Sequence, residues 1–75
     1  MSRATEFSRI TFGRAVRLER KRMKLSQEDF AERANVHRTY VSSIEHGKVS
    51  VSIEVAHSLA HALGLKLSGL IRKAE

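Results

Sequence analysis

A run of short polar side chains, together with one guanidinium and one phenol ring, lies between residues 37 and 46. These side chains are Arg38, Thr39, Tyr40, Ser42 and Ser43, and none of them is acidic. An arginine can donate two hydrogen bonds to O6 and N7 of guanine in the major groove, and a threonine methyl can touch the methyl of thymine. The segment could therefore read base edges. A helix packed against something else, with a merely soluble polar face, would look the same, and spacing alone leaves that alternative open.

Two histidines, His57 and His61, have the i, i+4 spacing of a helical metal site. No third or fourth ligand stands near them, so a pair on the protein surface is the favoured interpretation. The sequence also shows no Ser-His-Asp order, no glycine-rich phosphate loop and no paired carboxylates. We therefore expect no catalytic residue, no metal and no cofactor, and a protein that is not an enzyme.

The charge of the chain is strongly basic and unevenly distributed. The net charge is +6, and residues 1–24 hold eight lysines and arginines against only Glu6 and Glu19, whereas residues 25–75 are neutral. Such an excess points to a polyanionic partner, although a solvated helix face would show it too.

Length and composition predict one small domain over residues 1–75. The chain has 41% hydrophobic residues and no cysteine, which excludes disulfides and thiolate metal sites. No apolar run is long enough for a membrane helix, and no signal peptide is recognisable at the N-terminus. We expect a cytoplasmic protein without a membrane partner, and no small-molecule effector is evident because 75 residues leave no room for an effector domain.

The pattern of apolar residues predicts an all-α fold, a compact bundle of four to five short helices. Proline is absent and no segment alternates between apolar and polar residues as a strand would. We expect helices at about 8–23, after Ser26, at about 37–46, after Ser52, and over the apolar residues 65–71, where Ser68-Gly69 weakens helix propensity. Phe12, Val16 and Met23 are the inward candidates of the first helix.

Residues 27–46 have the features of two short helices that cross steeply. Such a pair needs a small residue where the backbones approach, a residue that tolerates positive φ at the turn, and apolar residues that hold the second helix. Ala31 meets the first need and Asn35 the second. The third is met by Phe30, Val36, Val41 and Ile44.

The stretches LSQEDFAERANVHRTYVSSIEHG and SIEVAHSLAHALGL resemble the helix-turn-helix of Cro/C1-type (Xre-like) transcription regulators and the helix that follows it. The resemblance covers about residues 12–71, leaving 1–11 as an N-terminal extension, and implies a lambda-repressor-like DNA-binding domain. Arg38-Thr39-Tyr40 followed by Val-Ser also resembles controller proteins of restriction–modification systems. Asn35 replaces the usual glycine of the turn, and His37 stands where a Ser, Thr or Asp cap is usual.

The resemblance also implies roles for single residues. Base edges would be read by Arg38, Thr39, Tyr40 and Ser43. The DNA backbone would be touched by Gln27, which also braces the recognition helix, and by His46 and Lys48. Arg20 and Glu45 occupy positions that form a buried ion pair in related phage repressors.

We therefore expect a sequence-specific regulator of transcription, a repressor or activator, that reads a near-palindromic operator in double-stranded DNA as a homodimer. One small bundle cannot bury the whole C-terminal apolar cluster, Leu65, Leu67, Leu70 and Ile71, so some of these residues are expected to form the dimer surface, or otherwise Phe7 and Ile10. Two other classes remain open at this stage. One is the antitoxin of a toxin–antitoxin pair that regulates its own synthesis through the same motif, and the other is a pure protein-interaction module.

Overall fold

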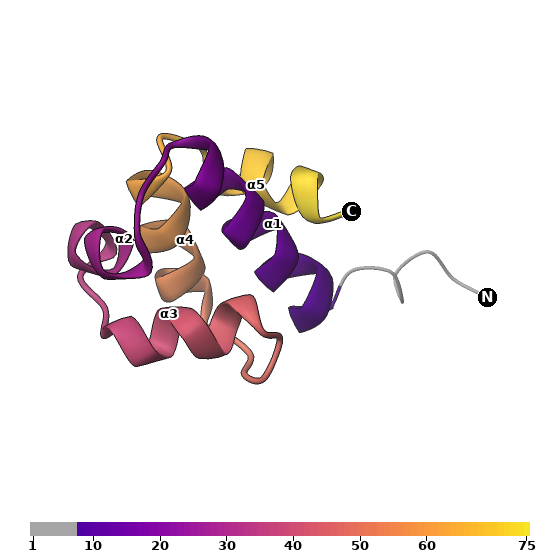
Figure 1. The fold of residues 1–75 in the computed structure, drawn as a ribbon. Helices are drawn as coiled ribbons and strands as arrows, with labels where there is room; N and C mark the ends of the chain where they lie inside the picture. The colour runs from indigo at the N-terminus through magenta and orange to yellow at the C-terminus, as the bar shows by residue number, and fades with distance from the viewer. Residues whose placement is uncertain (1–7) are drawn as a thin grey trace.

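The computed structural model describes residues 8–75, which form five α-helices (Figure 1). The helices are α1 (Arg9–Arg22), α2 (Gln27–Ala34), α3 (Arg38–Glu45), α4 (Ile53–Ala62) and α5 (Leu67–Ala74). No strand occurs within residues 8–75, so the all-α prediction is confirmed. In the same range, no helix is long and apolar enough to cross a membrane. Residues 1–7 of the expected N-terminal extension, with Phe7, lie outside the described residues.

Local hydrogen bonds set several of the helix ends where the sequence predicts them. The Ser26 hydroxyl accepts from the backbone N–H of Asp29 at 2.9 Å, and the Ser52 hydroxyl accepts from that of Val55 at 3.1 Å. Each serine thereby satisfies one of the amides that the first turn of a helix leaves free. Asn35 ends α2 in the left-handed region, with φ 60° and ψ 44°.

The first helix begins with a reciprocal cap and is one residue shorter at each end than expected. The Ser8 hydroxyl accepts from the N–H groups of Ile10 and Thr11, and the Thr11 hydroxyl accepts from the Ser8 N–H. Met23 follows the last helical residue as the C-cap and is 39% exposed. The expectation that Met23 points inward is therefore wrong, because the chain is already turning toward α2 at this position.

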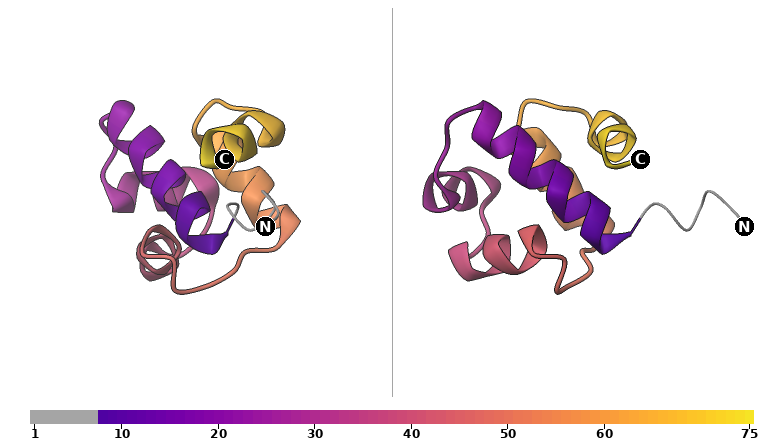
Figure 2. Two further views of the ribbon diagram at one scale, coloured as in Figure 1. Left: turned by 90° about the vertical axis from the view of Figure 1, so that its right-hand side faces the viewer. Right: turned by 45° about the vertical axis from the view of Figure 1, so that its right-hand side comes forward.

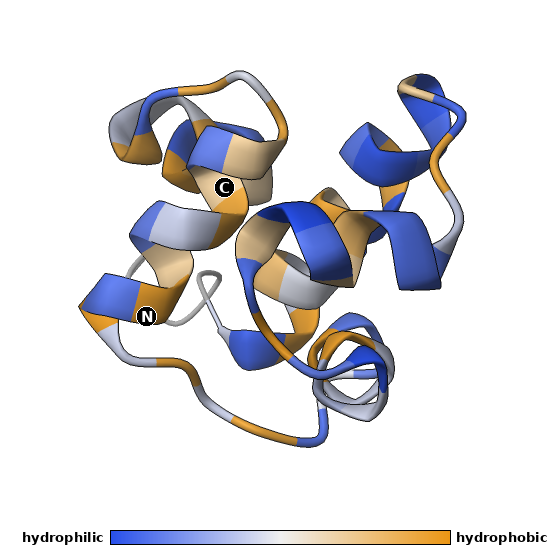
Figure 3. Cartoon of the chain, turned by 90° about the vertical axis from the view of Figure 1, so that its left-hand side faces the viewer, coloured by the Kyte–Doolittle hydropathy of each residue, from blue (hydrophilic) through white to orange (hydrophobic). Residues whose placement is uncertain are grey.

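One core lies between the helices and receives apolar side chains from all five. Figure 2 shows α1 crossing in front of α4, with α5 packed beside α1 and with α3 under it. The largest fully buried side chains are Val16, Phe30, Val41, Ile44, Leu59 and Leu70. Hydrophobic segments of the helices face this core, and hydrophilic segments cover much of the outer surface (Figure 3).

The C-terminal apolar cluster divides between the core and the surface. Leu70 is completely buried in the core, while Leu65 and Leu67 are half-buried against it. Leu70 is therefore not available to a second subunit, and only the other three residues of the cluster remain partly exposed. The helix continues past residue 71 to Ala74, which is also buried, and this extra turn lets α5 cover α1.

Gly13 allows α1 to lie directly on the end of α3. A Cβ built at Gly13 would stand 2.0 Å from the carbonyl oxygen of Ile44. Any side chain at this position would force the two helices apart, since protein interiors are close-packed. Gly13 therefore sets the distance between α1 and α3.

Candidate nucleic-acid interface

The turn between α2 and α3 is short and contains one residue, Asn35, in the left-handed backbone conformation. After Asn35, the backbone N–H of Val36 donates to the Ala31 carbonyl at 3.0 Å, which satisfies one of the free carbonyls at the end of α2. Ala31 and Ala34 are buried, so the two helices approach closely. The outcome is a helix-turn-helix with α3 along the lower edge of the molecule in Figure 1.

The third helix has an inner face and an outer face. Val41, Ile44 and Glu45 are buried and hold the helix on the core. Arg38 and Thr39 are exposed, and Ser43 on the same outer side is half-buried. Three of the four expected base-reading residues thus share the accessible face of α3.

Tyr40, the fourth expected base-reading residue, lies differently. Its ring is half-buried and packs against the core rather than standing free in solvent. The ring consequently supports α3 from the side. Only its exposed part is available to a ligand.

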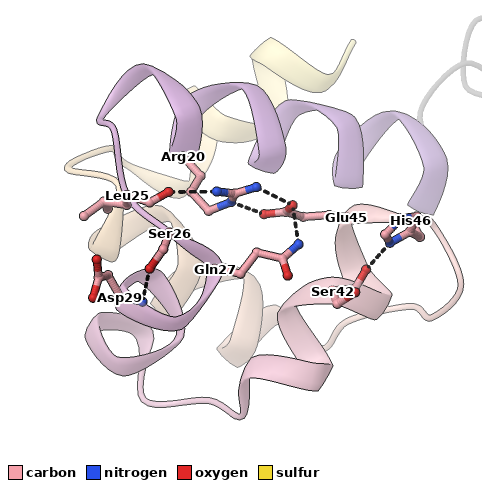
Figure 4. A network of polar contacts seen from close by, with 8 residues as sticks. All are labelled: Arg20, Leu25, Ser26, Gln27, Asp29, Ser42, Glu45 and His46. Atoms are coloured by element: carbon pink, nitrogen blue, oxygen red, sulfur yellow. Dashed lines mark hydrogen bonds and ion pairs between the residues drawn. The ribbon is translucent and has the colours of Figure 1, made fainter.

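A buried polar network holds the end of α3 (Figure 4). Arg20 of α1 donates from Nε to Glu45 Oε2 at 2.7 Å and from Nη2 to Glu45 Oε1 at 3.0 Å, and the two side chains are only 9% and 1% exposed. The third guanidinium nitrogen, Nη1, donates to the Leu25 carbonyl at 2.7 Å. Gln27 Nε2 donates to Glu45 Oε1 at 3.1 Å. Every charge in the network has a partner, which is what burial of charge requires.

Gln27 occupies a position that serves both the interior and the surface. It is the first residue of α2 and is half-buried. One N–H of its amide is used by Glu45, so Gln27 connects the start of α2 with the end of α3. The second N–H of an amide NH₂ group remains as a further donor.

Two more of the expected backbone-contacting residues, His46 and Lys48, are both exposed just beyond the C-terminal end of α3. Ring nitrogen Nδ1 of His46 lies 2.8 Å from the Ser42 carbonyl oxygen (Figure 4). Lys48 follows Gly47, whose φ of +70° turns the chain away from the helix.

Arg9 is part of the same surface, although no motif in the sequence marks it. Its Nε donates to the Gly47 carbonyl at 2.9 Å, across 38 positions of sequence, and its side chain is exposed. The bond places a guanidinium beside the segment that carries His46 and Lys48. Only the cluster of positive charge in residues 1–24 hinted at this role, because nothing local pairs position 9 with position 47.

His37 begins α3 as an N-cap. Its ring nitrogen Nδ1 accepts from the backbone N–H of Thr39 at 3.2 Å and lies 2.8 Å from the Thr39 hydroxyl oxygen. The imidazole therefore does the work usually done by a Ser, Thr or Asp side chain.

The remaining pair of interest, His57 and His61, is exposed on α4. Within residues 8–75, no three His, Cys, Asp or Glu side chains gather as a metal site would require.

A helix-turn-helix family model matches residues 16–70, which take in the second half of α1 and continue into α5. Among curated proteins, the chain is 40% identical over 68 residues to the control protein C.MunI from Mycoplasma sp, covering 89% of this chain and 92% of that protein. It is 34% identical over 62 residues to the immunity repressor protein of Bacillus phage phi105, covering 83% of this chain. The chain spans only 43% of the length of that repressor.

The fold is also similar to that of a solved structure. The restriction-modification controller protein C.AhdI from Aeromonas hydrophila superposes with a TM-score of 0.80 at 34% identity, covering 83% of this chain and 94% of that one. The sequence matches, the similar fold and the arrangement of α2 and α3 all indicate the same family. The chain belongs to the helix-turn-helix family of DNA-binding transcriptional regulators, in its Cro/C1 (Xre-like) branch.

Proposed function

We propose that the protein regulates transcription by binding a specific, near-palindromic operator in double-stranded DNA as a homodimer, and that it acts by binding rather than by catalysis. The recognition helix is α3, and its outer face enters the major groove. The observation that carries this proposal is the division of α3: Glu45 is fixed in a buried network, while Arg38 and Thr39 face outward. A rigid helix with a free polar face is the element that base reading requires.

Base edges are read by Arg38, Thr39 and Ser43, with a contribution from the exposed part of Tyr40. Arg38 has the longest reach and makes no hydrogen bond or ion pair with another side chain among residues 8–75, so both edges of its guanidinium can face guanine. Thr39 and Ser43 are short and read only bases directly beneath the helix. Contacts of this kind carry sequence information.

The DNA backbone is held near the C-terminal end of the recognition helix. Gln27, whose second amide N–H is a further donor, reaches Glu45 at the end of α3, and His46, Lys48 and Arg9 lie just beyond it. Contacts to phosphates fix the register of a helix in the groove without reading sequence. The positive charges of Lys48 and Arg9 also explain why binding would weaken as the salt concentration rises.

The two-fold surface of the homodimer lies at the start of α4 and the outer side of α5. Ile53 is 72% exposed, more than any other large apolar side chain among residues 8–75. Beside it is an apolar cavity of about 270 Å³, whose lining includes Phe12, Val51, Leu67 and Ile71. In a two-fold pair, Ile53 of each subunit can enter the cavity of the other, so one surface supplies both the knob and the hole.

Selection of bound sequences from a random pool of DNA duplexes tests the proposal. We expect a motif with two inverted half-sites whose centres are about one helical turn apart. Affinity for that motif should fall steeply between two salt concentrations. Recovery of no motif, or equal affinity at both salt concentrations, would instead favour a protein-interaction module.

A further inference from the structure

The two histidines that flank the recognition helix use the same ring nitrogen in opposite ways. Nδ1 of His46 faces the Ser42 carbonyl oxygen at 2.8 Å. A carbonyl oxygen can only accept a hydrogen bond, so Nδ1 of His46 carries a proton. Nδ1 of His37 faces the backbone N–H of Thr39 at 3.2 Å. A backbone N–H can only donate, so Nδ1 of His37 is bare and the ring proton of the neutral imidazole is on Nε2.

The bare Nδ1 of His37 determines what the Thr39 hydroxyl can do. The hydroxyl oxygen of Thr39 lies 2.8 Å from that nitrogen, close enough for a hydrogen bond between them. Since Nδ1 has no proton, the hydroxyl is the donor in the hydrogen bond between them, and it shares the single lone pair of Nδ1 with the backbone N–H of Thr39. The only O–H of Thr39 is then used within the protein, so toward DNA its oxygen can act only as a hydrogen-bond acceptor.

This constraint matters because a threonine on a recognition helix is otherwise ambiguous. A free hydroxyl can donate to guanine or thymine oxygen, or accept from adenine or cytosine amine. We propose that His37 is a positioning residue that makes Thr39 acceptor-only, so that Thr39 selects an adenine or cytosine through its exocyclic amine. The inference rests on the proposed function, because it assigns chemistry to one residue of the same DNA-reading face.

The tautomers can be tested without DNA, by long-range ¹H–¹⁵N spectra of the imidazole rings in the full chain at neutral pH. We expect His37 with its proton on Nε2 and His46 with its proton on Nδ1. The signals are assigned with the variants His37→Asn and His46→Asn. A proton on Nδ1 of His37 would overturn the inference and would leave the DNA-binding proposal intact.

The reading role can be tested by combining changes in protein and DNA. The position that Thr39 reads is the one whose base preference differs between selections with the wild type and with Thr39→Val. At that position, adenine is replaced by purine, or cytosine by 2-pyrimidinone, which removes only the exocyclic amine. We expect the wild type to lose affinity about fivefold, the ratio that corresponds to one neutral hydrogen bond.

The variant Thr39→Val should not respond to the loss of the amine, because it has no oxygen to accept from it. Equal losses in both proteins would show that Thr39 does not contact the amine, and the inference would fail. If the wild type selects no motif at all, the proposed function fails first, which separates the two results.

His37 variants then separate positioning from simple capping. His37→Ala frees the Thr39 hydroxyl, so the selection should broaden at that position to admit guanine or thymine. His37→Asn keeps an acceptor oxygen at the cap and should retain the amine preference. Thermal melts would verify that both variants fold. An unchanged preference in His37→Ala would show that His37 only caps the helix.

Discussion

Arg20 and Glu45 are 25 positions apart in sequence and meet in a buried, two-pronged ion pair under the recognition helix. Arg20 also holds the carbonyl of Leu25, and Glu45 also holds Gln27. One guanidinium thereby connects α1, the turn that follows it, and α3. The angle of α3 to the rest of the molecule depends on this pair.

Glu45→Gln should lower the free energy of unfolding by about 3–5 kcal/mol, because it leaves the Arg20 charge buried without its counter-charge. That is a large part of the stability of a domain of this size. The matched control is Glu54→Gln, since Glu54 is exposed. Thermal melts of the two variants measure the difference. Equal melting temperatures would mean that the pair contributes nothing to the fold.

Gly13→Ala should destabilise the protein by about 1–3 kcal/mol, the usual cost of overpacking, because the new methyl meets the backbone of Ile44. Gly69→Ala makes the same chemical change in α5, where nothing beyond the adjacent residues and the backbone of the helix itself lies within 4 Å of the new methyl. It should stabilise the protein by about 0.5–1 kcal/mol through lower backbone entropy of the unfolded chain. Denaturant titrations would measure the change in the free energy of unfolding for each variant. A stabilising Gly13→Ala would contradict the contact between α1 and α3.

Arg38→Ala and Lys48→Ala should weaken DNA binding in different ways. Arg38→Ala is expected to cost about 1–3 kcal/mol on the selected operator and to relax discrimination at particular base pairs. Lys48→Ala should weaken binding to all DNA sequences alike. It should also reduce the slope of log affinity against log salt concentration by about one unit. Binding titrations on the operator and on unrelated DNA, at several salt concentrations, distinguish the two. Unchanged affinity and preference in Arg38→Ala would move the reading face away from α3.

Arg9→Gln should also weaken binding to the operator and to unrelated DNA by the same factor, since Arg9 is proposed to contact phosphate. The dependence of affinity on salt concentration should fall by about one unit of slope. The control is Arg17→Gln, another exposed arginine of α1. If both variants lose the same affinity, Arg9 acts only through net charge. A thermal melt shows how much the bond to Gly47 contributes to the fold itself.

Ile53→Asp should give a folded monomer, because a charge placed at an exposed apolar contact opposes pairing without disturbing the core. Analytical ultracentrifugation measures the assembly state, and circular dichroism verifies the helices. Ile10→Asp is the comparison, as Ile10 is exposed on α1. A dimer that survives Ile53→Asp and dissociates with Ile10→Asp would move the two-fold surface to α1.

The helix ends could be predicted from the sequence because local hydrogen bonds determine them. Ser26 and Ser52 cap the amides that follow, and Asn35 adopts the left-handed turn that its side chain tolerates. The helix-turn-helix followed from these signals together with the apolar spacing and the family resemblance.

The contacts that the sequence did not predict join distant segments. Gly13 with Ile44 and Arg9 with Gly47 depend on how α1 lies across α3, and no local pattern encodes that crossing. The sequence also left open which residue of the C-terminal apolar cluster enters the core. The spacing of apolar residues does not say which of them the core of the same subunit has room for.

The alternation of inner and outer residues along α3 separates positions that packing constrains from positions that can vary. Positions 41, 44 and 45 are constrained by the core and the ion pair, whereas positions 38, 39 and 43 lie on the outer side and tolerate other polar residues without loss of packing. If these outer positions read the operator as proposed, we expect that grafting outer residues from a relative changes operator preference while the melting temperature stays nearly constant. The same scaffold can in this way diversify into regulators that do not cross-react.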